Sequence, residues 1–347
     1  MARKTNKVFE TTQEDIDKIL PENKELMGDF INYLEATDHS KTSIIVYQNN
    51  LNIFFIYIMK NCKNKDFVDI KKKDILLFQN AMLKGGLGTA RIKNIRSSIS
   101  SLSNYIESML SDDEEKWKNF RNIINKIPAP NGEAIREKTI LTDEQCQEIL
   151  DWLVEEKMYD YSAMFALAFA SGRRKQELLR IKHTWINDDN LMFGSLYKTP
   201  EKVTSKGRGS QGKMLYFYIL KQKFKPYFDL WMEERKKLGI SDEIEEMFVV
   251  KRKGEWTPAT SSSLDYLARK ISDKFNMNFY FHCLRHQFTT ALSESKIPAS
   301  VIKDIIGWND ISLVSTYTDT EVDDKLADYF GENGIKDNIK VGSLNNL

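Results

Sequence analysis

The stretch FHCLRHQFTTALSESKIPASVIKDIIGWNDISLVSTYTD, residues 281–319, decides the fold assignment of this chain. His282 and Arg285 stand three residues apart, so on a helix they lie within reach of one ligand group. A His-x-x-Arg pair alone more often has a structural role, so other segments must supply further groups. The first half of the stretch predicts a helix with one buried face, formed by Phe281, Leu284, Phe288 and Leu292.

Composition limits the class of protein. With 347 residues the chain is long enough for two domains, and 41% hydrophobic and 29% charged residues are typical of a globular protein. No apolar run approaches the ~20 residues of a membrane span, and the first residues lack the apolar core of a signal peptide. We therefore expect a cytoplasmic protein without a membrane partner. The widely spaced Cys62, Cys146 and Cys283 predict reduced core thiols and neither a zinc site nor a disulfide framework.

The periodicity of the chain predicts a mainly α fold with a small β-sheet, of the α+β class. Residues 1–20 are polar and expected to be flexible, and residues 21–126 carry apolar stripes typical of a four- or five-helix bundle. Residues 127–140, with two prolines and no periodicity, predict a linker. A second, mostly helical domain is expected over 141–332, interrupted by strands near 191–198 and 213–220, and a tail over 333–347.

Charge is unevenly distributed although the net charge is only +1. Lysine and arginine predominate over residues 41–96 and 173–225, and acidic helices lie between and after these segments. Such a pattern can form one positive face on a nearly neutral molecule, as nucleic-acid binding requires. Two ordinary solvated helix surfaces are the alternative.

A second basic constellation follows an apolar helix. In AFASGRRKQELLRI, a Ser-Gly turn precedes Arg173, Arg174 and a new helix start, where backbone N–H groups and guanidinium favour a phosphate. A solvated basic turn is the alternative. Further on, the predicted hairpin tip offers cations that can swing to a phosphate and protonate a leaving oxygen; they are Lys198, Lys202, Lys206, Arg208 and Lys213.

The last part of the opening stretch adds Trp308, an indole donor, and Tyr317, whose phenol can attack phosphorus when cations stabilise its anion. A single tyrosine is more often a packing residue. The order Arg, Lys, His-x-x-Arg, Trp, Tyr, however, resembles the catalytic domain of the tyrosine recombinases, the phage integrase family. The family's first box, Gly-x-Arg-x-x-Glu-Leu, is matched by Gly172, Arg174, Glu177 and Leu178.

Two further boxes carry the resemblance. His-x-Leu-Arg-His is matched throughout by HCLRH, and Gly307, Trp308 and Tyr317 match the last box. Trp308 stands where many members have His, and Arg173 occupies a usually apolar position. The helical part before residue 127 resembles the family's core-type DNA-binding domain, so the resemblance spans residues 20–330. It implies contacts to DNA by Lys41, Thr42, Arg91, Lys93 and Arg96.

The resemblance also implies a mechanism. Tyr317 would attack a DNA phosphate and form a 3′-phosphotyrosyl link, while Arg174 and Arg285 neutralise the charge that develops on the phosphate. His282 and Trp308 would hold the phosphate, with His282 a candidate base, and His286 would support them. Lys206, in a glycine-flanked turn, would protonate the 5′ oxygen, with Lys198 as the alternative. No metal or other cofactor is implied.

The implied partner is double-stranded DNA, clamped between the two domains. The segment EVDDKLADYFGENG, residues 321–334, predicts a short amphipathic helix that would dock on a neighbouring protomer. Docking of this kind implies a homotetramer on two DNA sites and a monomer or weak oligomer without DNA. Packing of the helix on its own chain is the alternative.

We therefore predict a site-specific DNA recombinase acting in integration or excision. Because fold does not fix function, a DNA-binding regulator such as a phage repressor, with lapsed chemistry, is an alternative. The complete set of catalytic residues argues against it. A type IB topoisomerase would share the active site, but it would be expected to lack the N-terminal domain in this form.

Overall fold

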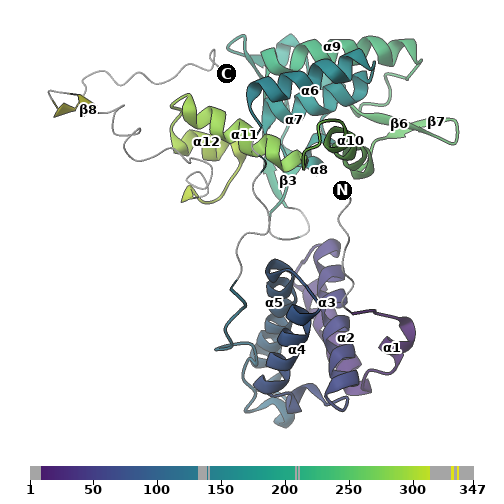
Figure 1. The fold of residues 1–347 in the computed structure, drawn as a ribbon, viewed down its shortest axis with the longest axis vertical. Coiled ribbons are helices and arrows are strands. Elements are labelled where there is room, and N and C mark those ends of the chain that lie inside the picture. The colour runs from purple at the N-terminus through teal and green to yellow at the C-terminus, as the bar shows by residue number, and fades with distance from the viewer. Residues whose placement is uncertain are drawn as a thin grey trace. The chain divides into compact units, whose positions relative to one another are not determined.

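A computed structural model of the chain describes residues 9–131, 139, 141–207, 209, 212–312, 330–331 and 334–335. The chain divides near residue 137 into two compact units, each with its own hydrophobic core (Figure 1). This division falls within the predicted linker, much of which lies outside the described residues. Each unit is therefore considered by itself.

The first unit is entirely helical in its described part. Its core is built from the apolar stripes seen in the sequence, with Phe30, Phe54 and Ile99 at most 1% exposed. Ser40 caps one long helix by accepting a hydrogen bond from the backbone N–H of Ser43. The elements are α1 (Gln13–Asp17), α2 (Pro21–Ala36), α3 (Lys41–Asn61), η1 (Phe67–Asp69), α4 (Lys72–Lys84), α5 (Thr89–Tyr105), η2 (Ile106–Leu110) and η3 (Glu115–Trp117).

Helix α1 lies within the residues that we expected to be flexible. The Thr12 side chain caps it by accepting from the backbone N–H of Asp15, and Ile19, which follows it, is 1% exposed. The ordered part of the chain thus begins earlier than predicted. A single buried isoleucine among polar residues gives no periodic signal, which is why the sequence pattern did not reveal it.

The second unit is built around one apolar helix. Helix α7 (Tyr159–Ser171) is buried from Ser162 to its end, and α6 (Asp143–Glu155), α9 (Lys221–Lys237) and α11 (Phe281–Glu294) pack around it (Figure 1). A helix that is apolar all round requires such complete enclosure. The remaining helices are α8 (Lys175–Leu178), η4 (His183–Trp185), η5 (Asp188–Asn190), α10 (Ser261–Lys274) and α12 (Ala299–Ile306).

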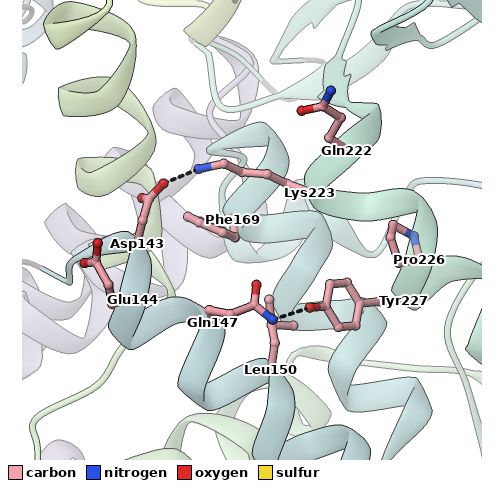
Figure 2. A pocket seen from close by; sticks show the side chains of 9 residues that line it. All are labelled: Asp143, Glu144, Gln147, Leu150, Phe169, Gln222, Lys223, Pro226 and Tyr227. Atoms are coloured by element: carbon pink, nitrogen blue, oxygen red, sulfur yellow. Dashed lines mark hydrogen bonds and ion pairs between the residues drawn. The ribbon is translucent and has the colours of Figure 1, made fainter. Parts of the chain in front are cut away.

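Two polar contacts join α6 to α9 over the surface of α7. Lys223 Nζ lies 2.8 Å from Asp143 Oδ2, and Gln147 Nε2 donates to the Tyr227 hydroxyl at 2.8 Å (Figure 2). Lys223 also lies 4.0 Å above the ring of Phe169. These residues line a shallow groove that contains none of the predicted catalytic residues. The contacts therefore stabilise the helical scaffold and involve none of the predicted catalytic residues.

Strands form in both segments where the sequence predicted them. The antiparallel sheet has the order β1 (Leu191–Met192), β2 (Leu196–Lys198), β5 (Tyr218–Leu220), and β3 (Val203–Ser205) pairs with β4 (Lys213–Leu215). Leu196 lies opposite Leu220 and Val203 opposite Leu215, so residues 199–202 bulge against 216–217. Because β3 lies within the predicted hairpin tip, that tip is shorter than expected. A further hairpin, β6 (Val249–Arg252) with β7 (Glu255–Pro258), was not predicted.

At the C-terminal end, β8 (Phe330–Gly331) pairs with β9 (Gly334–Ile335). These strands replace the end of the amphipathic helix predicted over 321–334, whose other residues lie outside the described part of the chain. All three cysteines are buried and free, as predicted. None of the helices in the described ranges is long and apolar enough to cross a membrane.

Gly172 ends α7 in a left-handed conformation, with φ of +58°. A Cβ at this position would lie 2.6 Å from Cδ1 of the Phe288 ring, which α11 carries. The glycine therefore allows both the turn into α8 and the close approach of α11. It also brings the backbone carbonyl of residue 172 next to the helix that carries His282 and Arg285.

We predict that Gly172→Ala lowers the free energy of unfolding by about 2–5 kcal/mol, the sum of left-handed strain and overpacking against Phe288. Gly239 follows α9 with φ of +68° and has no atom within 4 Å of its added Cβ. Gly239→Ala should therefore cost only about 1–2 kcal/mol. Urea denaturation of both variants measures the difference. Equal losses would show that the contact with Phe288 adds nothing.

Candidate active site

Three segments that are distant in sequence meet at Arg285. Its side chain is 0% exposed, with Nη1 donating to the Gly172 carbonyl at 2.9 Å and Nη2 to the Ile306 carbonyl at 3.2 Å. The guanidinium carbon lies 5.5 Å from the centroid of the Trp308 ring. The predicted boxes around Gly172, His282 and Gly307 are thus brought together. Direct contact of Arg285 with a phosphate stays a prediction, because the residue is enclosed.

Arg174 lies at the start of α8 and keeps 30% of its side chain exposed. Its Nη1 is 3.0 Å from Glu177 Oε1, and its backbone N–H donates to Glu177 Oε2 at 3.0 Å. Ser205, the last residue of β3, donates to the same carboxylate at 2.6 Å. These bonds join the first box to the strand that precedes Lys206.

Glu177 is a buried anion within this network, being 1% exposed. Burial alone would raise the pKa of its carboxyl. The hydrogen bonds from Ser205 and from the Arg174 backbone, with the charges of Arg173 and Arg174, outweigh burial and lower the pKa below its usual value. Glu177 therefore remains charged at neutral pH and holds the Arg174 side chain in place. Sequence reasoning missed Ser205, for which only its place beside Lys206 offered a signal.

The two candidate lysines have different surroundings. Lys206 is exposed directly after β3, and within the described part of the chain its ammonium makes no hydrogen bond or ion pair. Lys198 lies before the bulge, with Nζ 4.2 Å from the centroid of the Tyr216 ring. On the partner strand, Lys213 Nζ donates to Asn309 Oδ1 at 3.0 Å, which links the hairpin to the residue after Trp308. These surroundings favour Lys206 over Lys198 as the lysine that can move to a leaving oxygen.

His282 stands in the first turn of α11 and is exposed to solvent. Surrounding protein atoms, then the charges of Arg285 and Arg174, lower the pKa of its imidazole below 6.5. Its ring lies 4.8 Å from that of His286 in an edge-to-face arrangement. A neutral imidazole at pH 7 can accept a proton from a phenol, as a general base must.

Trp308 follows the end of α12. Gly307 has φ of +79°, and the backbone N–H groups of Gly307 and Trp308 both donate to the Lys303 carbonyl. This turn buries the Trp308 side chain to 6% exposure beside Arg285. Tyr317 lies outside the described residues, so its place in the site is a prediction from the sequence.

Arg173 differs from Arg174 in its burial and in its hydrogen-bond partners. It is 1% exposed, and its guanidinium donates to the carbonyls of Ile305 and Ile306 and lies 4.3 Å above the Phe217 ring. It is therefore a part of the core, whereas Arg174 reaches the surface. From the sequence, Arg173 was placed with Arg174 in a predicted phosphate-binding turn and was noted at a position that is usually apolar in the family.

The predicted DNA contacts of the first unit divide into two groups. Lys41 and Thr42, at the start of α3, and Arg91 and Lys93, on α5, are exposed. Arg96 is a correction: it is 6% exposed, and its guanidinium donates to Gln79 and, at 2.6 Å, to the Ile127 carbonyl. Its donors serve the fold, so we withdraw it from the set of DNA-contacting residues.

Among the residues that the structure describes, no cluster of three or more His, Cys, Asp or Glu side chains is placed to hold a metal ion.

Residues 139–323 match the model of the phage integrase family. The SPbeta prophage-derived recombinase-like protein YomM of Bacillus subtilis (strain 168) is 28% identical over 296 residues, which is 85% of each chain. Tyrosine recombinase XerA of Pyrococcus horikoshii is 24% identical over 303 residues, 85% of this chain and 89% of the relative.

Two solved structures share the fold. XerH site-specific recombinase bound to its difH substrate is 17% identical, with a TM-score of 0.63 over 92% of this chain and 98% of that one. A lambda integrase dimer bound to a COC′ core site is also 17% identical, with a TM-score of 0.60 over 91% and 80% of the two chains. The predicted mainly α fold with a small sheet is confirmed.

We predict that NMR titration gives the His282 imidazole a pKa below 6.5. Removing one of the lowering charges by Arg174→Gln should raise that pKa towards its ordinary value. Arg269, exposed on α10, is not among the groups that act on His282, so Arg269→Gln serves as the control. A wild-type pKa above 6.5 would contradict the assigned environment.

Proposed function

The chain belongs to the phage integrase family, the tyrosine recombinases, and we propose that it recombines DNA through Tyr317, with Arg174, Lys206, His282, Arg285 and Trp308 completing the active site. The observation that carries this proposal is the meeting of the three boxes at Arg285, through the carbonyls of Gly172 and Ile306. Gly172 and Arg285 lie more than a hundred positions apart in the sequence, and this contact supports their place in one site.

In the proposed first step, the Tyr317 phenol oxygen attacks a backbone phosphate and its proton passes to His282. The bond between phosphorus and the 5′ oxygen breaks, and Lys206 gives that oxygen a proton, so a 3′-phosphotyrosyl link and a 5′-hydroxyl result. A 5′-hydroxyl of another strand then attacks the link and reverses each transfer. The lowered pKa of His282 supports its role as the base.

Charge develops on the nonbridging oxygens during attack. Arg174 is supported as a direct ligand because it is partly exposed and oriented by Glu177. Arg285 adds a second, fixed positive charge, and its burial strengthens the effect of that charge. Direct binding by Arg285 requires the atoms that cover it to move when DNA binds.

We propose duplex DNA as the partner, bound in part by the exposed Lys41, Thr42, Arg91 and Lys93, and the cytoplasm as the site of action. Such phosphate contacts make affinity depend strongly on salt. One structure that shares the fold is a lambda integrase tetramer bound to a Holliday junction, 15% identical with a TM-score of 0.60. For this chain we propose a homotetramer on two DNA sites, and a monomer or weak oligomer without DNA.

The first test of this function is Tyr317→Phe. Loss of the nucleophilic oxygen should abolish the covalent protein–DNA adduct while the dissociation constant for duplex DNA stays within about twofold, because binding relies on other groups. Denaturing gels detect the adduct and mobility shifts measure binding. Adducts in the mutant would assign another nucleophile. A wild-type protein that binds but never forms adducts would favour the regulator.

The second test concerns the general acid. Lys206→Ala should slow cleavage of ordinary DNA by about 10²- to 10⁴-fold. A substrate with sulfur at the bridging 5′ position has a leaving group that needs no proton, so the same variant should cut it at nearly the wild-type rate. Lys198→Ala is the matched control and should show no such selective rescue. Rescue confined to Lys198→Ala would transfer the role to Lys198.

A further inference from the structure

We propose that Arg173 is a positioning residue of the active site, which holds the C-terminal end of α12 and thereby fixes Trp308 and Arg285. The inference rests on the proposed function for its link to cleavage. It starts from the neighbouring backbone. Gly172 supplies a carbonyl to Arg285, and the side chain of the next residue, Arg173, reaches the end of α12.

The end of a helix leaves its last carbonyls without intrahelical partners. At the end of α12, Arg173 donates to the carbonyls of Ile305 and Ile306, and Arg285 donates to that of Ile306. Cations are also favoured there by the helix dipole. The Ile306 carbonyl is therefore shared by a core arginine and a predicted catalytic arginine, and its position determines where both guanidinium groups lie.

Arg173 is a costly residue for a purely packing role. It is 1% exposed, and no carboxylate lies within ion-pair distance of it in the part of the chain that the structure describes. Burial lowers the pKa of its guanidinium to about 10, so it is still charged at neutral pH. An apolar side chain of similar volume fills such a place at no cost in charge desolvation. The directional bonds to α12 are what an apolar residue cannot provide.

The hydrogen bonds from Arg173 lie close to Trp308 and Arg285, which explains how they can position both residues. Trp308 follows Ile306 by two residues, and its ring lies 5.5 Å from the Arg285 guanidinium. Ile302 and Ile306, at most 1% exposed, anchor the apolar face of α12 independently of Arg173. Loss of Arg173 should therefore leave α12 packed but its end less firmly held. Trp308 and Arg285 would then be misplaced without global unfolding.

The test compares two buried arginines. Arg235, on α9, is also 1% exposed, and its guanidinium donates to the carbonyls of Glu246 and Ile244. It contacts no predicted catalytic residue, so Arg235→Met is the matched control for Arg173→Met. Both variants of the full chain are assayed for single-turnover cleavage at saturating DNA, at a temperature well below the melting temperature of each.

We expect Arg173→Met to slow cleavage by about 10- to 100-fold, the cost of misplacing reacting groups, with DNA affinity unchanged. Arg173→Lys should recover part of the rate. Arg235→Met should cleave at the wild-type rate once folded. The effect of Arg173→Met should be non-additive with Trp308→Phe and additive with Lys206→Ala. Wild-type cleavage by Arg173→Met, or equal slowing by Arg235→Met, would overturn the proposal.

A second readout separates this proposal from the proposed function. The NMR signal of the Trp308 indole N–H, identified by its loss in Trp308→Phe, should shift or broaden in Arg173→Met and stay unchanged in Arg235→Met. This measurement needs no DNA cleavage. If wild-type protein forms no adduct, the proposed function fails while the indole signal still decides the role of Arg173. An unchanged signal in Arg173→Met would refute it.

Discussion

The catalytic unit depends on the hydrogen bonds that the enclosed guanidinium of Arg285 donates. A fully buried cation has to find hydrogen-bond acceptors within the protein, because an unsatisfied charge is strongly destabilising. Here the acceptors are the carbonyls of Gly172 and Ile306, so the end of α7, the start of α11 and the end of α12 must converge. Gly172 makes this possible, since any side chain there would meet Phe288.

A second buried charge, the Glu177 carboxylate, organises another part of the site. The buried Glu177 carboxylate accepts from Arg174 and Ser205, and so connects the first box with the hairpin that carries Lys206. Arg174 acts on both groups: together with Arg173 it lowers the pKa of Glu177, and together with Arg285 it lowers the pKa of His282. The Arg174 charge thus helps to keep Glu177 charged and, with desolvation, to keep His282 neutral, which suits an orienting carboxylate and a general base.

The scaffold behind these charges is apolar and closely packed. Helix α7 is enclosed by α6, α9 and α11, and the polar pairs Asp143–Lys223 and Gln147–Tyr227 fix the outer helices over it. Catalytic groups that stand on packed helices are held within narrow limits. Lys206 lies at the end of a short strand, where a long side chain has room to move towards and away from a leaving group.

The sequence by itself determined the helix faces, the strands near 191–198 and 213–220, and the boxes around Arg174, His282 and Trp308, because each depends on spacing between nearby residues. The sequence alone could not show which of the basic residues are buried. Arg96 and Arg173 share the chemistry of exposed basic residues, yet distant carbonyls, such as those of Ile127 and Ile306, enclose them. Helix α1 and the β6–β7 hairpin were missed because such short elements, of five and of four residues per strand, give no clear periodic signal. Only the tertiary structure decides which charges a protein buries, since the partners that satisfy them lie far away along the chain.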